Sequence, residues 1–191
     1  QFLEQFEKIF QGYHDEKETL QEKLANLPTA FDYIRLGHPL SCVLEWLIAK
    51  SRGLNEENVI CFSSQTMPIL AILRKNLLDN INTKIIYKNE LPRYFDVEVF
   101  KNIYGYKFEL VRNTNNEEIS SFNGRTLVLT EFDKAWNIEL GNNIDFVICI
   151  DPVFGSIALV NGVKNKSYIS EIQHVRRRES IAMTPHDCFT V

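Results

Sequence analysis

The chain has 191 residues, of which 45% are hydrophobic and 24% are charged, and its formal net charge is −4. These values predict a globular protein with one sizeable core, and they exclude a disordered chain and a protein that coats nucleic acid over its whole surface. No apolar run is long enough to cross a membrane, and the N-terminus carries acids where a signal peptide has a basic region. The four cysteines lack zinc or redox spacing. We therefore expect an intracellular protein with buried free thiols.

The first 27 residues place apolar side chains at alternating three- and four-residue steps. This pattern predicts a long helix that ends at Pro28, although Gly12 permits a break within it. Such a helix either packs on its own domain or binds a partner protein as a coiled coil. We accordingly divide the chain into an N-terminal helix, residues 1–30, and a second domain, residues 31–191.

A second helix is predicted from Pro39 to Ser51, because proline suits a first helical position and Gly53 suits a helix end. Beyond it, short apolar segments rich in β-branched residues alternate with helical patterns. Continuous apolar strands separated by helices predict an α/β fold, with a mostly parallel sheet and helices on both faces. The predicted strands cover residues 59–63, 84–87, 107–111, 126–130, 146–150, 157–160 and 188–191, and the predicted helices cover residues 66–79, 96–104 and 170–178.

The sequence contains no phosphate-binding P-loop, no G-x-G-x-x-G turn, no nucleophile elbow and no histidine pair with metal-ligand spacing. We therefore expect no cofactor, no metal and no catalytic residue. A basic cluster stands out instead. Neighbouring helical residues point about 100° apart, so the cluster is either a salt-bridged helix face or a contact for phosphate or a partner. Its members are Arg176, Arg177 and Arg178, preceded by Lys164 and Lys166.

Several segments, taken in order, resemble the C-terminal RecA-like lobe of Swi/Snf-type helicases. In that family the end of the lobe's first strand lies near the nucleic acid backbone. The resemblance therefore makes Ser63, Ser64 and Gln65 candidate nucleic-acid contacts, together with the basic cluster. The matching segments are Arg35 with His38-Pro39, residues 59–65, residues 121–130, residues 138–140, residues 150–154, and the spacing of Gln173, Arg177, Ile181 and Thr184.

The departures from the helicase pattern imply a degenerate motor. Gln173 is kept, but Trp136 lies in a bulky segment that replaces a glycine-rich turn, and Ser180 replaces an arginine that stabilises phosphate charge in the family. A lobe of this kind is similar to the accessory subunits of the yeast class II histone deacetylase complex. The resemblance implies a non-catalytic, nuclear module that binds DNA or nucleosomes and the protein subunits of a chromatin complex.

Two alternatives remain open. The chain is also compatible with the second lobe of an ATP-dependent DNA translocase whose P-loop lobe lies elsewhere. In addition, Tyr33-x-Arg35 and Phe62-Ser63-Ser64 resemble the large domain of pyridoxal-phosphate lyases. That fold needs a Schiff-base lysine in a S-x-x-K setting after the Asp151 segment, and the sequence has none there.

Overall fold

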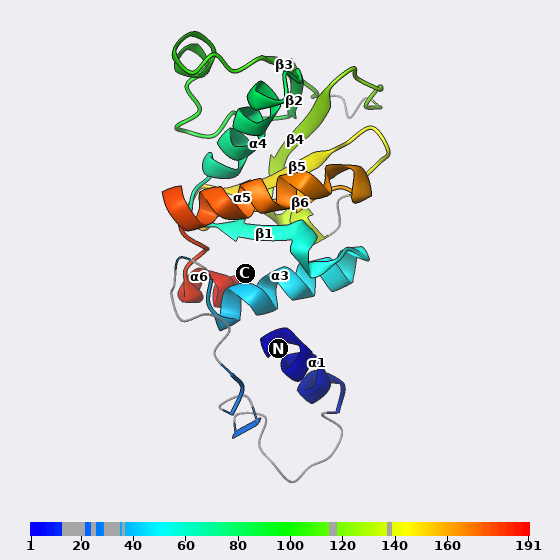
Figure 1. The fold of residues 1–191 in the computed structure, drawn as a ribbon, viewed down its shortest axis with the longest axis vertical. Helices are drawn as coiled ribbons and strands as arrows, with labels where there is room; N and C mark the ends of the chain where they lie inside the picture. Colours follow the sequence, from blue (N-terminus) through cyan, green and yellow to red (C-terminus); the bar gives the residue numbers. More distant parts are fainter. Residues whose placement is uncertain (13–21, 24–25, 29–34, 36, 115–117, 137–138) are drawn as a thin grey trace.

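The computed structural model describes residues 1–12, 22–23, 26–28, 35, 37–114, 118–136 and 139–191. Its centre is a single six-stranded sheet with the order β1-β6-β5-β4-β2-β3 (Figure 1). β2 pairs in parallel with β3 and β4, and β4 pairs in parallel with β5, whereas β6 is antiparallel to both β5 and β1. Every strand except β6 therefore runs in one direction. The strands are β1 (Val59–Phe62), β2 (Thr83–Tyr87), β3 (Phe108–Arg112), β4 (Arg125–Glu131), β5 (Phe146–Asp151) and β6 (Gly155–Val160).

Helices cover both faces of this sheet, as the sequence predicts. Successive strand residues point to opposite faces, so Ile60 and Phe62 join one core while Val59 and Cys61 join the other. The first core includes α4 (Met67–Leu78) and α5 (Lys166–Glu179), which pack against each other. The second includes α3 (Pro39–Arg52) and α6 (Pro185–Thr190). The generic α/β class is confirmed.

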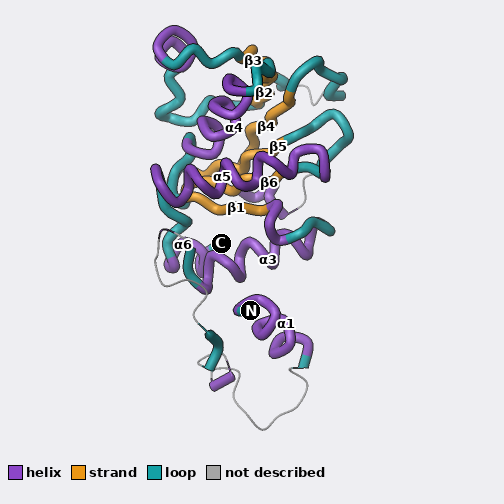
Figure 2. The backbone as a smooth tube through the Cα atoms, in the orientation of Figure 1, coloured by secondary structure: helices purple, strands orange, loops and turns teal. Residues whose placement is uncertain are grey.

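Short elements and loops complete the described chain, as Figure 2 shows by colour. Between β2 and β3 the chain makes one π-helical turn, η3, where the sequence predicts a helix over residues 96–104. These short elements are the 3-10 helices η2 (Glu56–Asn58), η4 (Phe132–Trp136) and η5 (Val163–Asn165), and the π-helical η3 (Val99–Ile103).

The described N-terminal helix, α1 (Phe2–Gln11), packs on its own domain. Its Phe6 and Phe10 rings lie edge-on to Trp46 of α3, with ring centroids 5.5 and 5.6 Å away, and Glu7 pairs with Lys50 at 2.9 Å. α1 ends beside Gly12, where the sequence permits a break. Residues 13–21 and 24–25, over which a longer helix is predicted, lie outside the described residues.

The closing strand predicted for residues 188–191 is wrong, because residues 188–190 belong to α6 and Val191 caps that helix. Thr184 begins the helix by accepting a hydrogen bond from the Asp187 backbone N–H at 3.2 Å, and Pro185 occupies a first-turn position where its missing N–H costs nothing. These capping signals outweigh the β preference of the last few residues. No helix in the described part of the chain is both long and apolar enough to span a membrane.

Candidate functional site

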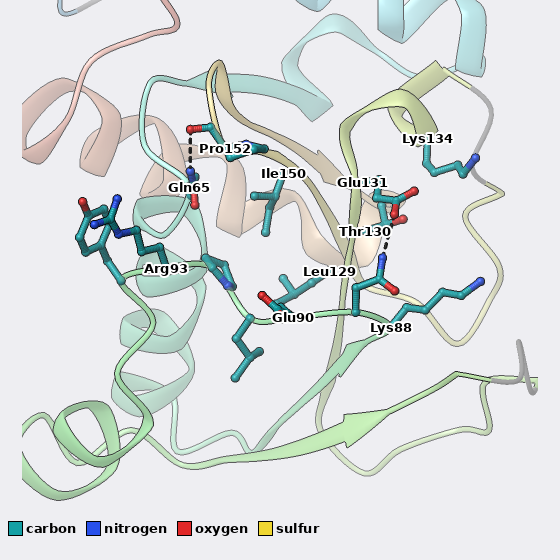
Figure 3. A pocket seen from close by; sticks show the side chains of 14 residues that line it. Gln65, Lys88, Glu90, Arg93, Leu129, Thr130, Glu131, Lys134, Ile150 and Pro152 are labelled. Atoms are coloured by element: carbon teal, nitrogen blue, oxygen red, sulfur yellow. Dashed lines mark hydrogen bonds between the residues drawn. The ribbon is translucent and has the colours of Figure 1, made fainter.

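A cavity of about 1140 Å³ lies outside the carboxyl ends of β1, β2, β4 and β5 (Figure 3). We call it the cleft. Parallel strands bring their carboxyl ends to the same edge of a sheet, and open α/β sheets bind ligands in the crevice there. The segment after each strand supplies part of the wall. The lining consists of Gln65, residues 88–94, residues 129–131, Lys134, Ile150 and Pro152.

The cleft has an apolar floor with charged side chains of both signs around it. Leu129 and Ile150, from the neighbouring strands β4 and β5, form the floor. Figure 3 shows Arg93 on the side of Gln65 and Glu131 on the other side. Such a cavity matches a ligand that carries both an anionic and a cationic group.

Each charged end is held by a neighbour. The Asn89 Nδ2 donates to the Glu131 Oε1 at 2.8 Å, which orients the carboxylate and leaves its second oxygen to accept another donor. The Arg93 guanidinium lies 5.4 Å from the centre of the Tyr94 ring, close enough for a cation–π contact. Gln65 closes the first side by donating to the Pro152 carbonyl at 3.2 Å.

Two lysines also line the cleft, but neither lies over its floor. Figure 3 shows the amines of Lys88 and Lys134 directed away from Leu129 and Ile150. The Lys134 Nζ lies 3.1 Å from the Asp133 carboxylate. The chain turns from β5 into β6 at Pro152, which has no amine to offer.

The start of α4 borders the cleft beside Gln65, and its backbone donors are largely occupied. The Ser64 Oγ accepts from the backbone N–H groups of Thr66 and Met67 at 3.3 and 3.2 Å, and Pro68 has no N–H. A helix start binds an anion through these first donors. The capping by Ser64 therefore leaves little for a phosphate group.

The candidate nucleic-acid contacts do not gather at one place. Ser63, Ser64 and Gln65 follow the carboxyl end of β1. Lys164 lies 3.1 Å from Asp145, the residue before β5, and Lys166 lies 3.5 Å from Glu57, just before β1. The two lysines thus lie at the opposite edge of the sheet, each beside a carboxylate.

The three arginines of α5 point in different directions, as expected for adjacent helical residues. Arg176 is only 6% exposed and forms an ion pair with Glu45 of α3, whereas Arg177 and Arg178 are exposed. The Arg177 Nε donates to the Gln173 carbonyl of its own helix at 3.3 Å. Contact of the exposed arginines with DNA, or of α1 with a protein partner, remains a prediction.

The three positions assigned to a degenerate motor do not line the cleft. Trp136 ends η4 and packs, half-buried, against the core beneath α3. Ser180 ends α5, and Gln173 is half-buried within that helix.

Sequence analysis missed the cleft residues Asn89, Arg93 and Glu131. One signal was available, because Glu131 ends a continuous apolar strand and polar residues at such strand ends face a common edge.

No family model and no curated protein matches the chain. Solved structures are similar in fold. A cystathionine gamma-lyase from Lactobacillus plantarum complexed with L-serine has a TM-score of 0.53 and 12% identity, covering 84% of this chain and 51% of its own. The structure of metB from Corynebacterium glutamicum has a TM-score of 0.53 and 12% identity, and the match covers 95% of this chain and 56% of metB. A cystathionine gamma synthase from Xanthomonas oryzae in complex with aminoacrylate and cysteine has a TM-score of 0.52 and 11% identity, and the match covers 86% of this chain and 52% of the synthase. The chain thus spans about half the length of these structures.

These similarities correct the helicase interpretation. The similar structures are pyridoxal-phosphate-dependent enzymes, so neither a RecA-like helicase lobe nor a histone deacetylase scaffold is supported, and the translocase alternative fails with them. The expectation of a non-enzyme is likewise contradicted, since the similar structures named above are enzymes. The nuclear location, which the helicase resemblance alone implied, is therefore not supported. The resemblance of Phe62-Ser63-Ser64 to the lyases agrees with the fold, while Tyr33 lies outside the described residues.

Pyridoxal phosphate, the cofactor that this fold implies, does not fit the cleft in its usual tethered form. Enzymes hold it through a Schiff-base lysine and an acidic or basic partner of the ring nitrogen. Glu131 could serve as that partner. However, the β5–β6 turn has Pro152 in place of an amine, the lysine amines point off the floor, and Ser64 occupies the donors that would bind the phosphate. We derive no chemical step through this cofactor.

Proposed function

We propose that the cleft binds an extended amphoteric amino acid with a charged group at each end of its chain, such as L-cystathionine. The observation that carries this proposal is the placement of a cation and a carboxylate on opposite sides of an apolar floor, within a cavity of about 1140 Å³. A cavity of this size suits a ligand larger than a free small amino acid. Two of the similar structures are named as complexes with serine and with aminoacrylate and cysteine, and this supports a ligand of the amino-acid class.

Each part of such a ligand has a matching group in the cleft. The Glu131 carboxylate, oriented by Asn89, would accept hydrogen bonds from the ligand ammonium. The Arg93 guanidinium would donate two parallel hydrogen bonds to the ligand carboxylate, in the geometry that arginine favours. Leu129 and Ile150 would contact the apolar chain between them. Both charged groups are therefore needed for tight binding.

Calorimetric titration of the full chain tests this function. We expect L-cystathionine to bind more tightly than L-methionine or L-serine, because only a ligand with a charged group at each end of its chain reaches both Arg93 and Glu131. The Glu131→Gln substitution should weaken binding about tenfold or more, since the charged hydrogen bond between the ligand ammonium and the carboxylate is lost. Glu171→Gln, on the exposed surface of α5, removes the same charge outside the cleft and should leave binding unchanged.

Equal binding of analogues that lack either the ammonium or the carboxylate would contradict the proposal. Equal losses in the two glutamate variants would contradict the assignment of Glu131. Free pyridoxal phosphate is the second probe. We expect no aldimine absorbance at about 420 nm. If the band forms, and borohydride reduction places it on Lys88 or Lys134, the cofactor does belong to this cleft.

A further inference from the structure

A second cavity, of about 500 Å³, lies at the amino ends of β2 and β3. We call it the amino-edge cavity. It is separate from the cleft, which lies at the carboxyl ends of the strands. Its walls come from η3, from the segments just before β2 and β3, and from the segment before β4. The side chains that define its chemistry are Lys101, Tyr106, Lys107, Phe108, Glu109 and Phe122.

The aromatic part of this wall is held in place by packing. Phe108, the first residue of β3, is only 8% exposed, and its ring lies 5.7 Å from that of Phe95. Phe95 in turn meets Phe100 of η3 edge-on, with the ring centroids 4.8 Å apart. The Tyr106 backbone N–H donates to the Phe100 carbonyl at 3.0 Å. These contacts fix η3 and the segment after it against the sheet, so the wall exists before a ligand arrives.

The two lysines of the lining have no acidic partner, whereas its carboxylate has a cationic one. The Lys101 Nζ lies over the ring at the start of β3, 5.0 Å from its centre, and the Lys107 Nζ donates to the Asn80 side-chain oxygen at 2.8 Å. Among the residues that the structure describes, no carboxylate pairs with either ammonium group. Glu109, by contrast, lies 3.7 Å from the Lys84 Nζ. The cavity therefore keeps an excess of positive charge, although the net charge of the chain is −4.

We propose that the amino-edge cavity binds a small planar aromatic anion, such as a nucleoside monophosphate or an aromatic carboxylate. The ring of the ligand packs against the aromatic side chains of the lining. Its anionic group accepts hydrogen bonds from Lys101 and Lys107. An ammonium group has three donors, so Lys107 keeps two after it has bound Asn80. The volume lies within the range of small-molecule sites.

The combination of rings and cations argues against simpler ligands. Inorganic phosphate would pair with the lysines but leave the aromatic wall in contact with water. A neutral aromatic compound would cover the rings and leave both ammonium groups without a partner. A cationic ligand would be repelled. Both features of the proposed ligand are thus needed.

Calorimetric titration of the full chain with adenosine 5′-monophosphate and with indole-3-acetate tests the proposal. We expect at least one of the two to bind, and the one that binds more tightly identifies the source of the anion. Compounds that lack one feature should bind about tenfold or more weakly. These are adenosine and ribose 5-phosphate for the nucleotide, and indole and acetate for the carboxylate.

A double lysine variant locates the site. Lys101→Gln combined with Lys107→Gln should weaken binding of the same probe about tenfold or more, because both charged hydrogen bonds are lost. Both side chains are exposed, so the fold should be retained, and urea unfolding checks this. Lys166→Gln is the matched control. It removes an exposed lysine beside Glu57, next to β1 and at the other end of the strand order from β3, and should leave binding unchanged.

Three results would overturn the proposal. The first is that neither probe binds. The second is that the compound without a ring, or the compound without a charge, binds as tightly as the complete probe. The third is an unchanged affinity in the folded double lysine variant, which would place the probe elsewhere on the molecule. None of these results bears on the Glu131→Gln test, because the cleft lies at the opposite edge of the sheet.

Discussion

Replacing Arg176 by methionine should lower the free energy of unfolding by about 3–5 kcal/mol, because it leaves the largely buried Glu45 carboxylate, 13% exposed, without its cationic partner. Glu45 joins three elements, since it lies on α3, pairs with α5 and accepts from the Cys61 backbone N–H of β1 at 2.9 Å. Urea unfolding measured at an unchanged slope gives the difference directly.

The control for Arg176 lies two residues away on the same helix. Arg178→Met removes an exposed cation and should change stability by less than about 0.5 kcal/mol. Combining Arg176→Met with Glu45→Leu should cost less than the two single changes added together, because no unpaired charge remains. Similar losses in Arg176→Met and Arg178→Met would show that Arg176 has no special structural role.

Replacing Gly155 by alanine should destabilise the fold by more than about 4 kcal/mol, enough to threaten folding altogether. Gly155 begins β6 with φ of +105°, and an added Cβ would lie 2.2 Å from the Phe62 carbonyl oxygen and 2.7 Å from the Ser63 carbonyl carbon. Both neighbours are backbone atoms at the end of β1, so relief requires the sheet itself to move. A loss of cooperative unfolding, seen by circular dichroism, is the expected result.

Gly53→Ala separates steric conflict from backbone strain. Gly53 ends α3 with φ of +63°, but an added Cβ would have no atom within 4 Å, so only the left-handed conformation is penalised. The expected cost is about 1 kcal/mol. A cost for Gly155→Ala as small as this would mean that the close approach between the β5–β6 turn and β1 is not needed for folding.

The misleading helicase resemblance has a physical explanation. In any parallel α/β sheet, apolar strands end in polar residues that face a common edge, and helices follow at similar spacing. Residues 59–65 and 150–154 match helicase motifs at such strand ends, where unrelated folds look most alike. The direction of β6 was a discriminating signal within reach, because only three residues separate it from β5 and a parallel connection needs a dozen or more.

The sequence by itself determined the α/β class and the approximate position of six strands and of α3, because continuous apolar runs and the signals at Pro39 and Gly53 act over short distances. Only the tertiary structure decided that Arg176 is buried against Glu45 and that Arg93 and Glu131 flank one cleft. Each of these contacts joins residues from different elements. Their pairing depends on strand order and helix packing, which no local pattern encodes.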